Sequence, residues 1–315
     1  MQNNVNSQQP PLNYTTKLAY GIGDLGGSIT GNILLFFLSP FLTDVVGLAP
    51  SLAGLSQLVG KFWDAINDPI VGVLSDRTKS KLGRRYPWMI YGAIPFGIFF
   101  FLQWIIPHFS DNNNINQWGL FWYYTIISIA FNSFYTVVNL PYTALTPELT
   151  DDYNERTSLN SFRFFFSIGG SILSVIIFGI INNIWGSNPP LHYLINGGIC
   201  AFLSVIPLYI CVWGTRDRTL SSPIQNAQIN HDNHTSFWQQ LKTALSNKPF
   251  LFVLGIYLFS WLSMQLTATI LPYFVVSYMR LNNQYVVPVV LAVQGTAMIM
   301  LFIWSKVSER FGKKE

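Results

Sequence analysis

The sequence predicts an all-α protein that crosses a membrane several times. Its 315 residues are 50% hydrophobic and only 10% charged, and the mean hydropathy is +0.33. Soluble domains carry about 25% charged residues, so this composition excludes an ordinary water-soluble fold. The apolar residues also form stretches that can cross roughly 30 Å of hydrocarbon as helices, at about 1.5 Å per residue. We therefore expect a polytopic membrane protein.

Eight apolar stretches reach the length of a membrane span. They cover residues 20–44, 52–75, 86–107, 118–144, 160–184, 192–213, 250–278 and 285–306. The polar connector at 214–249 separates six spans from two, which predicts a six-helix bundle at 17–213, a central loop, and two further helices at 250–315. Residues 1–16 are polar and have no basic segment before an apolar core, so they predict a cytoplasmic tail and not a cleaved signal peptide.

Lysine and arginine gather in alternate connectors. The connectors at 76–85, 145–159 and 214–249 are basic, as is the tail after Trp304, whereas the intervening connectors hold only Arg280. Basic connectors stay in the cytoplasm, by the positive-inside rule. The sequence therefore predicts a multi-pass protein of the inner or plasma membrane, with its N-terminus in the cytoplasm. Membrane lipid is an expected partner, and nucleic acid is not.

Two carboxylates lie inside the second predicted span. Asp64 and Asp68 share one face of a helix, with Asn67 beside them and Lys61 one turn earlier. Two like charges this close in a low-dielectric setting cannot both stay ionised unless a cation lies between them or one takes a proton. Because hard cations prefer oxygen ligands, the pair predicts a site for Na⁺, Li⁺ or H⁺. The alternative is a structural ion pair of Lys61 with Asp64, and a helix-end Asp68 before Pro69.

Other polar groups in the spans are candidates for binding a polar substrate. Asp24, one or two turns into the first span, could reach a substrate or a cation, or could be an interfacial cap. Asn139 precedes the helix break at Pro141 and could bind a hydroxyl or an adjacent helix, and Thr136 could complete the cation site. Arg163 has a planar fork suited to paired hydroxyls or a carboxylate, although it could also snorkel to the interface.

Two motifs match known ligand-binding patterns, but their positions in the sequence do not support those functions. Gly21-Ile22-Gly23-Asp24-Leu25-Gly26 matches a dinucleotide-binding fingerprint, but that fingerprint needs a preceding strand and a βαβ unit. Here it begins a membrane span, where small residues let helices pack closely. His231-Asp232-Asn233-His234 could hold a metal but lies in a polar loop. We therefore expect no cofactor, and the sequence shows no nucleophile–base pair or metal cluster that would predict an enzyme.

The chain resembles the glycoside–pentoside–hexuronide:cation symporters of the major facilitator superfamily, the melibiose permease group. The most specific match is Trp63-Asp64-Ala65-Ile66-Asn67-Asp68-Pro69, and further matches are Lys17–Gly21, Thr43–Leu48, Thr146–Thr150 and Arg163–Phe165. The resemblance implies a major facilitator fold, with a complete N-terminal six-helix bundle and two helices of the C-terminal bundle. It also implies cation-coupled symport of a sugar or glycoside by alternating access.

The resemblance also implies roles for single residues. It assigns the coupling cation to Asp64, Asn67, Asp68 and Thr136, with Na⁺ at Asp64 and Asp68 if transport is sodium-coupled. It assigns Arg163 to the network around the sugar.

The expected sugar ligands depart from the family pattern. The span-1 aspartate that binds sugar hydroxyls in the melibiose permease is Ser28 here. Its span-4 aspartate is Asn139 here, and the sugar-stacking tryptophan that follows is Thr143. Cation coupling is therefore better supported than any particular sugar, and the sequence determines neither the sugar nor the ion.

Members of that family have twelve spans, and this sequence stops in the turn that should lead to the ninth. We therefore expect Gln265, Thr267 and Gln294 to lack partners. We also expect the chain alone not to couple sugar transport unless a second polypeptide supplies the missing helices. The alternative class is a non-transporting membrane protein, either a sugar sensor or an inactive truncated permease.

Overall fold

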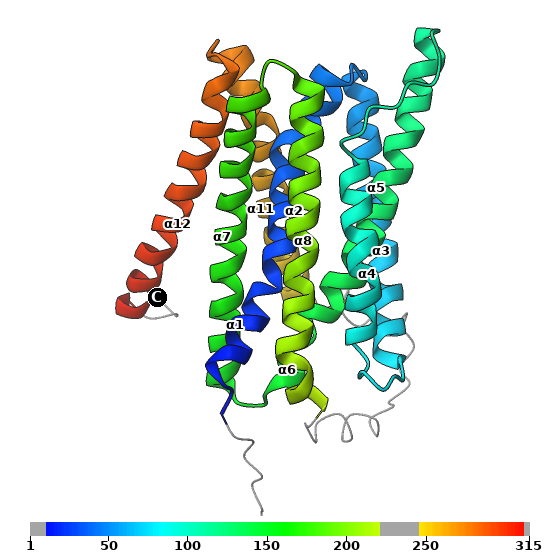
Figure 1. Ribbon diagram of the computed structural model, residues 1–315. Coiled ribbons are helices and arrows are strands. Elements are labelled where there is room, and N and C mark those ends of the chain that lie inside the picture. The colour runs from blue at the N-terminus through cyan, green and yellow to red at the C-terminus, as the bar shows by residue number, and fades with distance from the viewer. Residues whose placement is uncertain (1–10, 221–245, 312–315) are drawn as a thin grey trace, which may run out of the picture.

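The computed structural model describes residues 11–220 and 246–311, and these residues form helices without a strand (Figure 1). The first crossing is broken into α1 (Tyr14–Ile22), α2 (Asp24–Ile33) and two π-helical turns, η1 (Leu34–Leu38) and η2 (Phe41–Val45). The helices that complete the N-terminal bundle are α3 (Pro50–Arg77), α4 (Tyr86–Leu102), α5 (Asn113–Thr143), α6 (Thr146–Leu149), α7 (Tyr153–Trp185) and α8 (Pro189–Leu220). The last elements are α11 (Lys248–Tyr273), η4 (Phe274–Tyr278), η5 (Asn283–Tyr285) and α12 (Val286–Phe311).

Each predicted span corresponds to a long helix or to a broken one. Among the described residues, the segments long and apolar enough to cross a membrane are Tyr14–Leu38, Tyr153–Trp185, Pro189–Thr219, Lys248–Tyr278 and Asn283–Met300. Helix α4 is apolar but shorter, and α3 is more polar because it carries the predicted cation-binding acids. The central loop was expected from residue 214, but α8 continues to Leu220. The His231–His234 motif lies outside the described residues.

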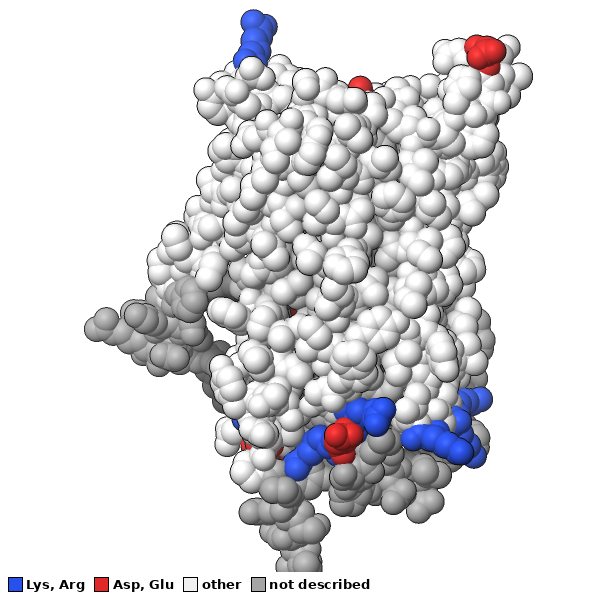
Figure 2. Space-filling view, in the orientation of Figure 1, with Lys and Arg blue, Asp and Glu red and all other residues white. Residues whose placement is uncertain are grey.

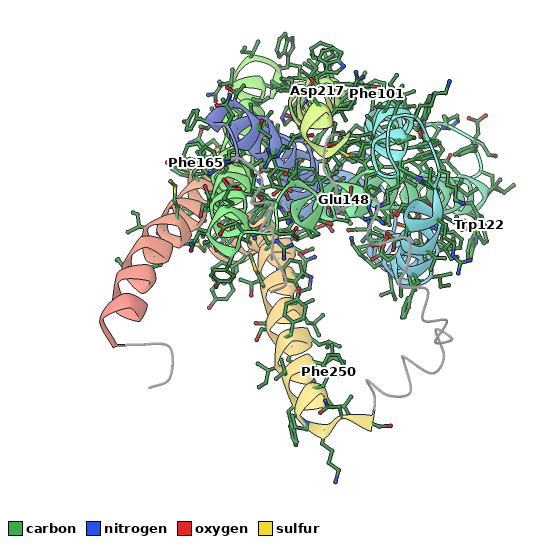
Figure 3. The ribbon with its side chains drawn as sticks, turned by 90° about the horizontal axis from the view of Figure 1, so that it is seen from below. Phe101, Trp122, Glu148, Phe165, Asp217 and Phe250 are labelled. Carbon is green, nitrogen blue, oxygen red and sulfur yellow. The ribbon has the colours of Figure 1, made fainter. Side chains whose placement is uncertain are left out.

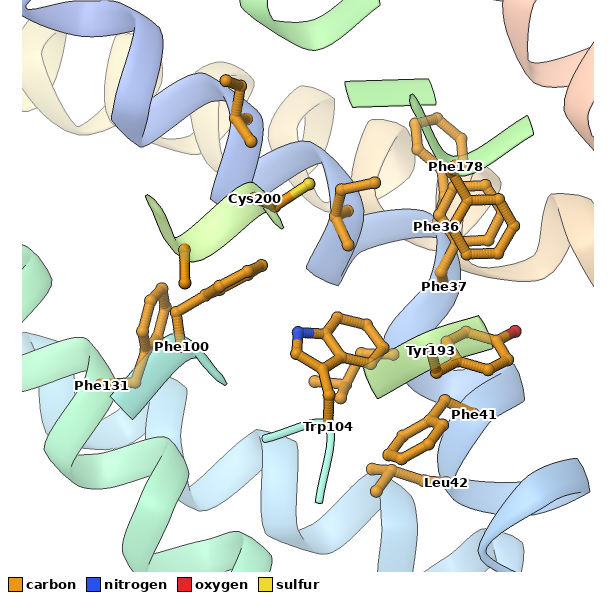
Figure 4. Packing of buried hydrophobic residues seen from close by; sticks show 14 of the residues in the cluster. Phe36, Phe37, Phe41, Leu42, Phe100, Trp104, Phe131, Phe178, Tyr193 and Cys200 are labelled. Carbon is orange, nitrogen blue, oxygen red and sulfur yellow. The ribbon is translucent and has the colours of Figure 1, made fainter. Parts of the chain in front are cut away.

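Aromatic side chains fill the centre of the N-terminal bundle (Figure 4). Phe41 packs against both Trp104 and Tyr193, and the Trp104 and Tyr193 rings stack with their centroids 5.6 Å apart. Lipid tails are as apolar as these side chains, so close van der Waals packing stabilises the bundle more than burial does. These contacts join the first span to the turn after α4 and to α8.

Glycines bring the first span close to its neighbours. A Cβ atom at Gly26 would lie 2.2 Å from the carbonyl oxygen of Ser204, and one at Gly23 would lie 2.6 Å from the Tyr142 ring. Real Cβ atoms essentially never approach that closely, so a side chain at Gly26 would push α2 away from α8. The packing interpretation of the glycine-rich motif is therefore confirmed.

A charged cluster fixes the connector between α3 and α4. The buried Glu148 of α6 accepts hydrogen bonds at Oε1 from Arg84 Nε at 2.8 Å and from Arg85 Nε at 3.1 Å. Arg85 also pairs with Asp76 and donates to Ser75 Oγ. Lysine and arginine side chains gather at this end of the molecule (Figure 2). The cluster thus holds together the end that the charge pattern predicts to be cytoplasmic.

Helices α11 and α12 meet the N-terminal bundle mainly toward the opposite end. Thr43 Oγ1 lies 2.9 Å from Tyr273 Oη, and Gln294 Nε2 donates to Asn32 Oδ1 at 2.7 Å. The first half of α11 is exposed, and the helix leans away from the others toward Phe250 (Figure 3). α12 likewise diverges from α7 toward its C-terminal end (Figure 1).

Gln294 corrects an expectation from the sequence. It was expected to lack a partner, but α12 packs against α7 and brings its amide within reach of Asn32 on α2. Thr267, in contrast, is exposed and donates to Ser263 O of its own helix.

Replacement of Gly26 by alanine should destabilise the bundle by about 1–3 kcal/mol, because the added methyl group overpacks the α2–α8 contact. The matched control is Gly31→Ala in the same helix, since a Cβ there meets nothing within 4 Å. The measurement is the temperature at which the purified protein loses its monodisperse size-exclusion peak. Equal midpoints for the two variants would contradict the proposed close contact.

Candidate functional site

The predicted cation-binding residues lie on a seam between α3 and α5. Trp63 Nε1 donates to Ser133 Oγ at 2.7 Å, and Thr136 Oγ1 donates to Asp68 Oδ1 at 2.8 Å. A Cβ at Gly60 would lie 2.3 Å from Ser128 Oγ, so the two helices touch there. The structure therefore brings Thr136 directly onto the acidic face of α3.

The two acids on this seam have different surroundings. Asp64 Oδ2 lies 3.4 Å from Lys61 Nζ, while Asp64 Oδ1 is buried and has no hydrogen-bond partner. Asn67 is only 7% exposed, and its Nδ2 is also buried without a partner. Asp68 is more exposed and uses one oxygen for Thr136. The predicted Lys61–Asp64 ion pair is thus present, but one ammonium group neutralises only one of two carboxylates.

The atoms without partners fit a cation. A buried polar atom that makes no hydrogen bond is destabilising by about 1–3 kcal/mol, and by more when it is charged. Asp64 Oδ1 would gain a partner from a hard cation, which prefers oxygen ligands. A flip of the Asn67 amide would place its oxygen where the unpartnered Nδ2 now lies, because the two ends of an amide are nearly the same size. Asp64, Asn67 and Asp68 could therefore offer oxygen from one face of α3.

A second cluster of polar side chains surrounds Asp24, which belongs to the first span. Asp24 Oδ2 is 3.5 Å from Arg163 Nε, and the Arg163 guanidinium lies 5.8 Å from the centre of the Tyr142 ring. Asp24, Asn139, Tyr135 and Tyr142 line a small cavity of about 10 Å³. That volume holds roughly one water molecule. Arg163 is thus paired inside the bundle, and Asn139 faces a cavity.

Sequence reasoning assigned no role to Tyr135. This side chain lines the cavity beside Asp24, and its sequence neighbour Thr136 bonds to Asp68. Tyr135 is therefore one residue away from the contact with the acidic face of α3. Its position next to Thr136 in the polar stretch of α5 was the available signal.

Two predicted substrate ligands bond to their own helices. Ser28 Oγ donates to the backbone carbonyl of Asp24 at 2.7 Å, and Thr143 Oγ1 donates to that of Leu140 at 2.9 Å. Neither residue is among those lining the cavity at Asp24. Their substrate-binding role stays a prediction.

The fold and these polar groups define a class of protein. Ionisable side chains within membrane helices that face the interior of the bundle are typical of transporters. Residues 19–315 match the family described as MFS/sugar transport protein, where MFS denotes the major facilitator superfamily. The chain belongs to this family, and the predicted major facilitator fold is confirmed.

The relatives of this chain are named as symporters. A protein of Synechocystis named an uncharacterized symporter is 46% identical, over 96% of this chain and 69% of its own length. YagG of Escherichia coli, whose name assigns it to glycoside/cation symport, is 34% identical over 66% of this chain and 44% of its own. Sodium-dependent lysophosphatidylcholine symporter 1 of Mus musculus is 26% identical over 96% of this chain and 60% of its own. The chain thus spans less than two thirds of the latter two relatives, and the predicted resemblance to cation symporters is confirmed.

Removal of one member of the Asp24–Arg163 pair should be more destabilising than removal of both. Arg163→Gln leaves a half-buried carboxylate without its counter-charge, which should lower the unfolding free energy by roughly 1–3 kcal/mol. Adding Asp24→Asn should restore most of this loss. The measurement is thermal unfolding of the four proteins of a double-mutant cycle.

The control for this cycle is Asp151→Asn, which alters the exposed ion pair with Arg156. Its effect should stay within about 0.5 kcal/mol. Additive effects of Arg163→Gln and Asp24→Asn would show that the two charges do not interact.

Proposed function

We propose that this protein carries out cation-coupled symport of a sugar or glycoside by alternating access. The observation that carries the proposal is the set of polar atoms at the α3–α5 seam. Asp64 Oδ1 and Asn67 Nδ2 are buried without partners, and Asp68 is bonded to Thr136 on the facing helix. The names of the relatives, which specify symport and glycoside/cation coupling, support the same class.

The proposed cation binds between Asp64 and Asp68. It reduces the repulsion between the two carboxylates and takes the place of the partner that Asp64 Oδ1 lacks. Sodium and a proton both satisfy this requirement, because sodium accepts oxygen ligands and a proton neutralises one acid. The sodium dependence in the mouse relative's name favours sodium as the first ion to test.

The proposed substrate site is the cavity beside Asp24. Asp24 and Asn139 accept hydrogen bonds and the Tyr135 hydroxyl can donate one, while Arg163 lies beside the cavity as the ion-pair partner of Asp24, which together suit a hydroxylated ligand. The cavity now holds about 10 Å³, so the helices around it must separate before a sugar can bind. Alternating access requires such a movement.

Coupling between the two sites follows from adjacent residues of α5. Thr136 bonds to Asp68 at the proposed cation site, and Tyr135 lines the proposed sugar cavity. A cation that fixes Asp68 and Thr136 also fixes the backbone that positions Tyr135. Each ligand should then raise the affinity for the other by the same factor, as linkage requires.

The orientation in the membrane belongs to the same proposal. The clustering of lysine and arginine at the end of the molecule that holds Glu148 and Arg85 supports a cytoplasmic location for that end (Figure 2). The N-terminus then lies in the cytoplasm of a cell with the protein in its inner or plasma membrane.

Asp64→Asn and Asp68→Asn should each lower cation affinity by at least about 100-fold, because each removes an anionic ligand. The first measurement is binding of radioactive sodium to the purified full chain, and the second is sugar uptake into sealed proteoliposomes driven by a sodium or a proton gradient. The control is Asp111→Asn in a connector, where the side chain is fully exposed. Unchanged ion dependence in both seam variants would contradict the assignment of the cation site to Asp64 and Asp68. Sugar binding without uptake would favour the alternative that the protein is a sugar sensor.

Thr136→Val should weaken cation binding by about tenfold, because it removes the hydroxyl that positions Asp68 while keeping the side-chain shape. The control is Thr125→Val in the same helix, whose buried hydroxyl bonds only to its own backbone at Phe121. Direct binding of radioactive sodium to the purified protein tests this difference. Equal losses in the two variants would mean that the hydroxyl has only a structural role.

A further inference from the structure

A larger cavity lies at the end of the helices, apart from the sites described above. Its volume is about 180 Å³, and its walls come from the first span, the end of α7, the start of α8, the end of α11 and the start of α12. It shares no lining residue with the cavity at Asp24. In the proposed orientation it faces the outside of the cell.

The cavity contains a buried polar group without a partner. His192 is 4% exposed, and its Nε2 is buried and makes no hydrogen bond. The side chains of Asp44, Asn182 and Asn283 also line the cavity. Asp44 is exposed and accepts a hydrogen bond from Thr43 Oγ1 at 2.7 Å, which leaves further acceptor positions on its carboxylate. Imidazole, carboxylate and amide groups therefore surround one space.

Aromatic rings form the other walls. The Phe37 and Phe178 rings stack with their centroids 3.7 Å apart, and the His192 ring meets the Phe178 ring edge-on with a centroid distance of 4.5 Å. Tyr193, which also lines the cavity, is held by its stack on Trp104. Phe37, Phe178 and Tyr193 lie close together in the structure (Figure 4). The rings are fixed by one another and need not reorganise when a ligand binds.

We propose that this cavity is a second binding site, and that its ligand is a single hydroxylated ring of monosaccharide size. A sugar ring has an apolar face that packs on aromatic side chains and hydroxyl groups that bond to carboxylate, amide and imidazole. The cavity volume is about 180 Å³, compared with about 10 Å³ for the water-sized cavity at Asp24, which leaves room for one ring. It is far larger than one alkali ion, and smaller than the ~300–1,000 Å³ pockets that hold drug-sized ligands.

Binding here would act on the arrangement of the helices. Phe37, Phe178 and His192 belong to the N-terminal bundle, whereas Pro272 and Val286 belong to α11 and α12. The Thr43–Tyr273 hydrogen bond, also between the two groups of helices, lies beside the cavity. A ligand that contacts both groups stabilises the conformation in which they meet at this end. The choice of ligand rests on the cavity's own chemistry and does not depend on the proposed transport.

The test uses a cysteine placed in the cavity. Asn283 is an exposed lining residue, and the native Cys200 and Cys211 are fully buried, so Asn283→Cys adds one reactive thiol among the described residues. The full chain is placed in lipid nanodiscs, because glucoside and maltoside detergents would themselves offer sugar. Its reaction with a water-soluble maleimide is followed with and without glucose, galactose, xylose and their 4-nitrophenyl glycosides. We expect at least one of these probes to slow the reaction.

The controls separate direct binding from other causes. Asn113→Cys is exposed at the start of α5, outside the cavity, and its reaction should be unaffected by any probe. Adding Asp44→Asn or His192→Phe to Asn283→Cys should raise the sugar concentration needed for protection by about tenfold, as expected when the ligand loses one hydrogen bond or charge-assisted contact. Because Asp44 is exposed, its variant keeps the test valid even if His192→Phe misfolds.

The second site is tested separately from the proposed transport site beside Asp24. Adding Asp24→Asn disables the cavity beside Asp24, and protection of Asn283→Cys should persist in that background. Protection that disappears there, an absence of protection by every sugar in the panel, or protection by sodium chloride alone would each overturn the second site.

Discussion

The constraint on which this structure depends is that a polar group within a membrane helix must find its partner inside the protein. Water is absent from hydrocarbon, so a side chain that does not bond to the backbone of its own helix must find its partner on another helix or in a ligand. Asp24 pairs with Arg163 of α7, Asp68 bonds to Thr136 of α5, and Gln294 of α12 bonds to Asn32. Each contact links helices that are distant in the sequence. The polar side chains therefore determine which apolar helices are neighbours, a choice that apolar packing alone leaves open.

The exceptions to this constraint are as informative as the contacts. Asp64 Oδ1 and Asn67 Nδ2 are unpartnered at the seam where a cation is proposed, and His192 Nε2 is unpartnered at the larger cavity. Trp104 Nε1 is also unpartnered, but it lies in the aromatic core and faces neither described cavity. Glu148 Oε2 is also unpartnered, although Glu148 pairs with two arginines in the structural cluster. The inference of a ligand at the seam and at the larger cavity therefore rests on the unpartnered atom together with the neighbouring carboxylates or the open volume.

The sequence was most informative where one helix contains the whole pattern. Asp64, Asn67 and Asp68 lie within five residues, so helical periodicity alone placed them together. The pairing of Asp24 with Arg163 could not be predicted in the same way, because the two residues belong to different helices and their contact depends on how α2 and α7 pack. Ser28 was matched to the permease by sequence position, but its side chain takes a rotamer in which the hydroxyl bonds to the backbone carbonyl of Asp24. Composition predicts where the helices lie in the sequence, whereas the face that each helix turns toward its neighbours depends on packing.

The way the two groups of helices meet bears on how the molecule can move. Within the N-terminal bundle, Glu148 bonds to two buried or half-buried arginines, and Gly26 has no room for even a methyl group, so this bundle should move as one body. The hydrogen bonds from the bundle to α11 and α12 join neutral groups, at Thr43–Tyr273 and Asn32–Gln294. Neutral hydrogen bonds contribute about 0.5–1.5 kcal/mol each, so exchanging them for others requires little free energy. A rigid bundle joined to its neighbours by weak, replaceable contacts is what alternating access requires, because one end can open while the other closes without unpacking either core.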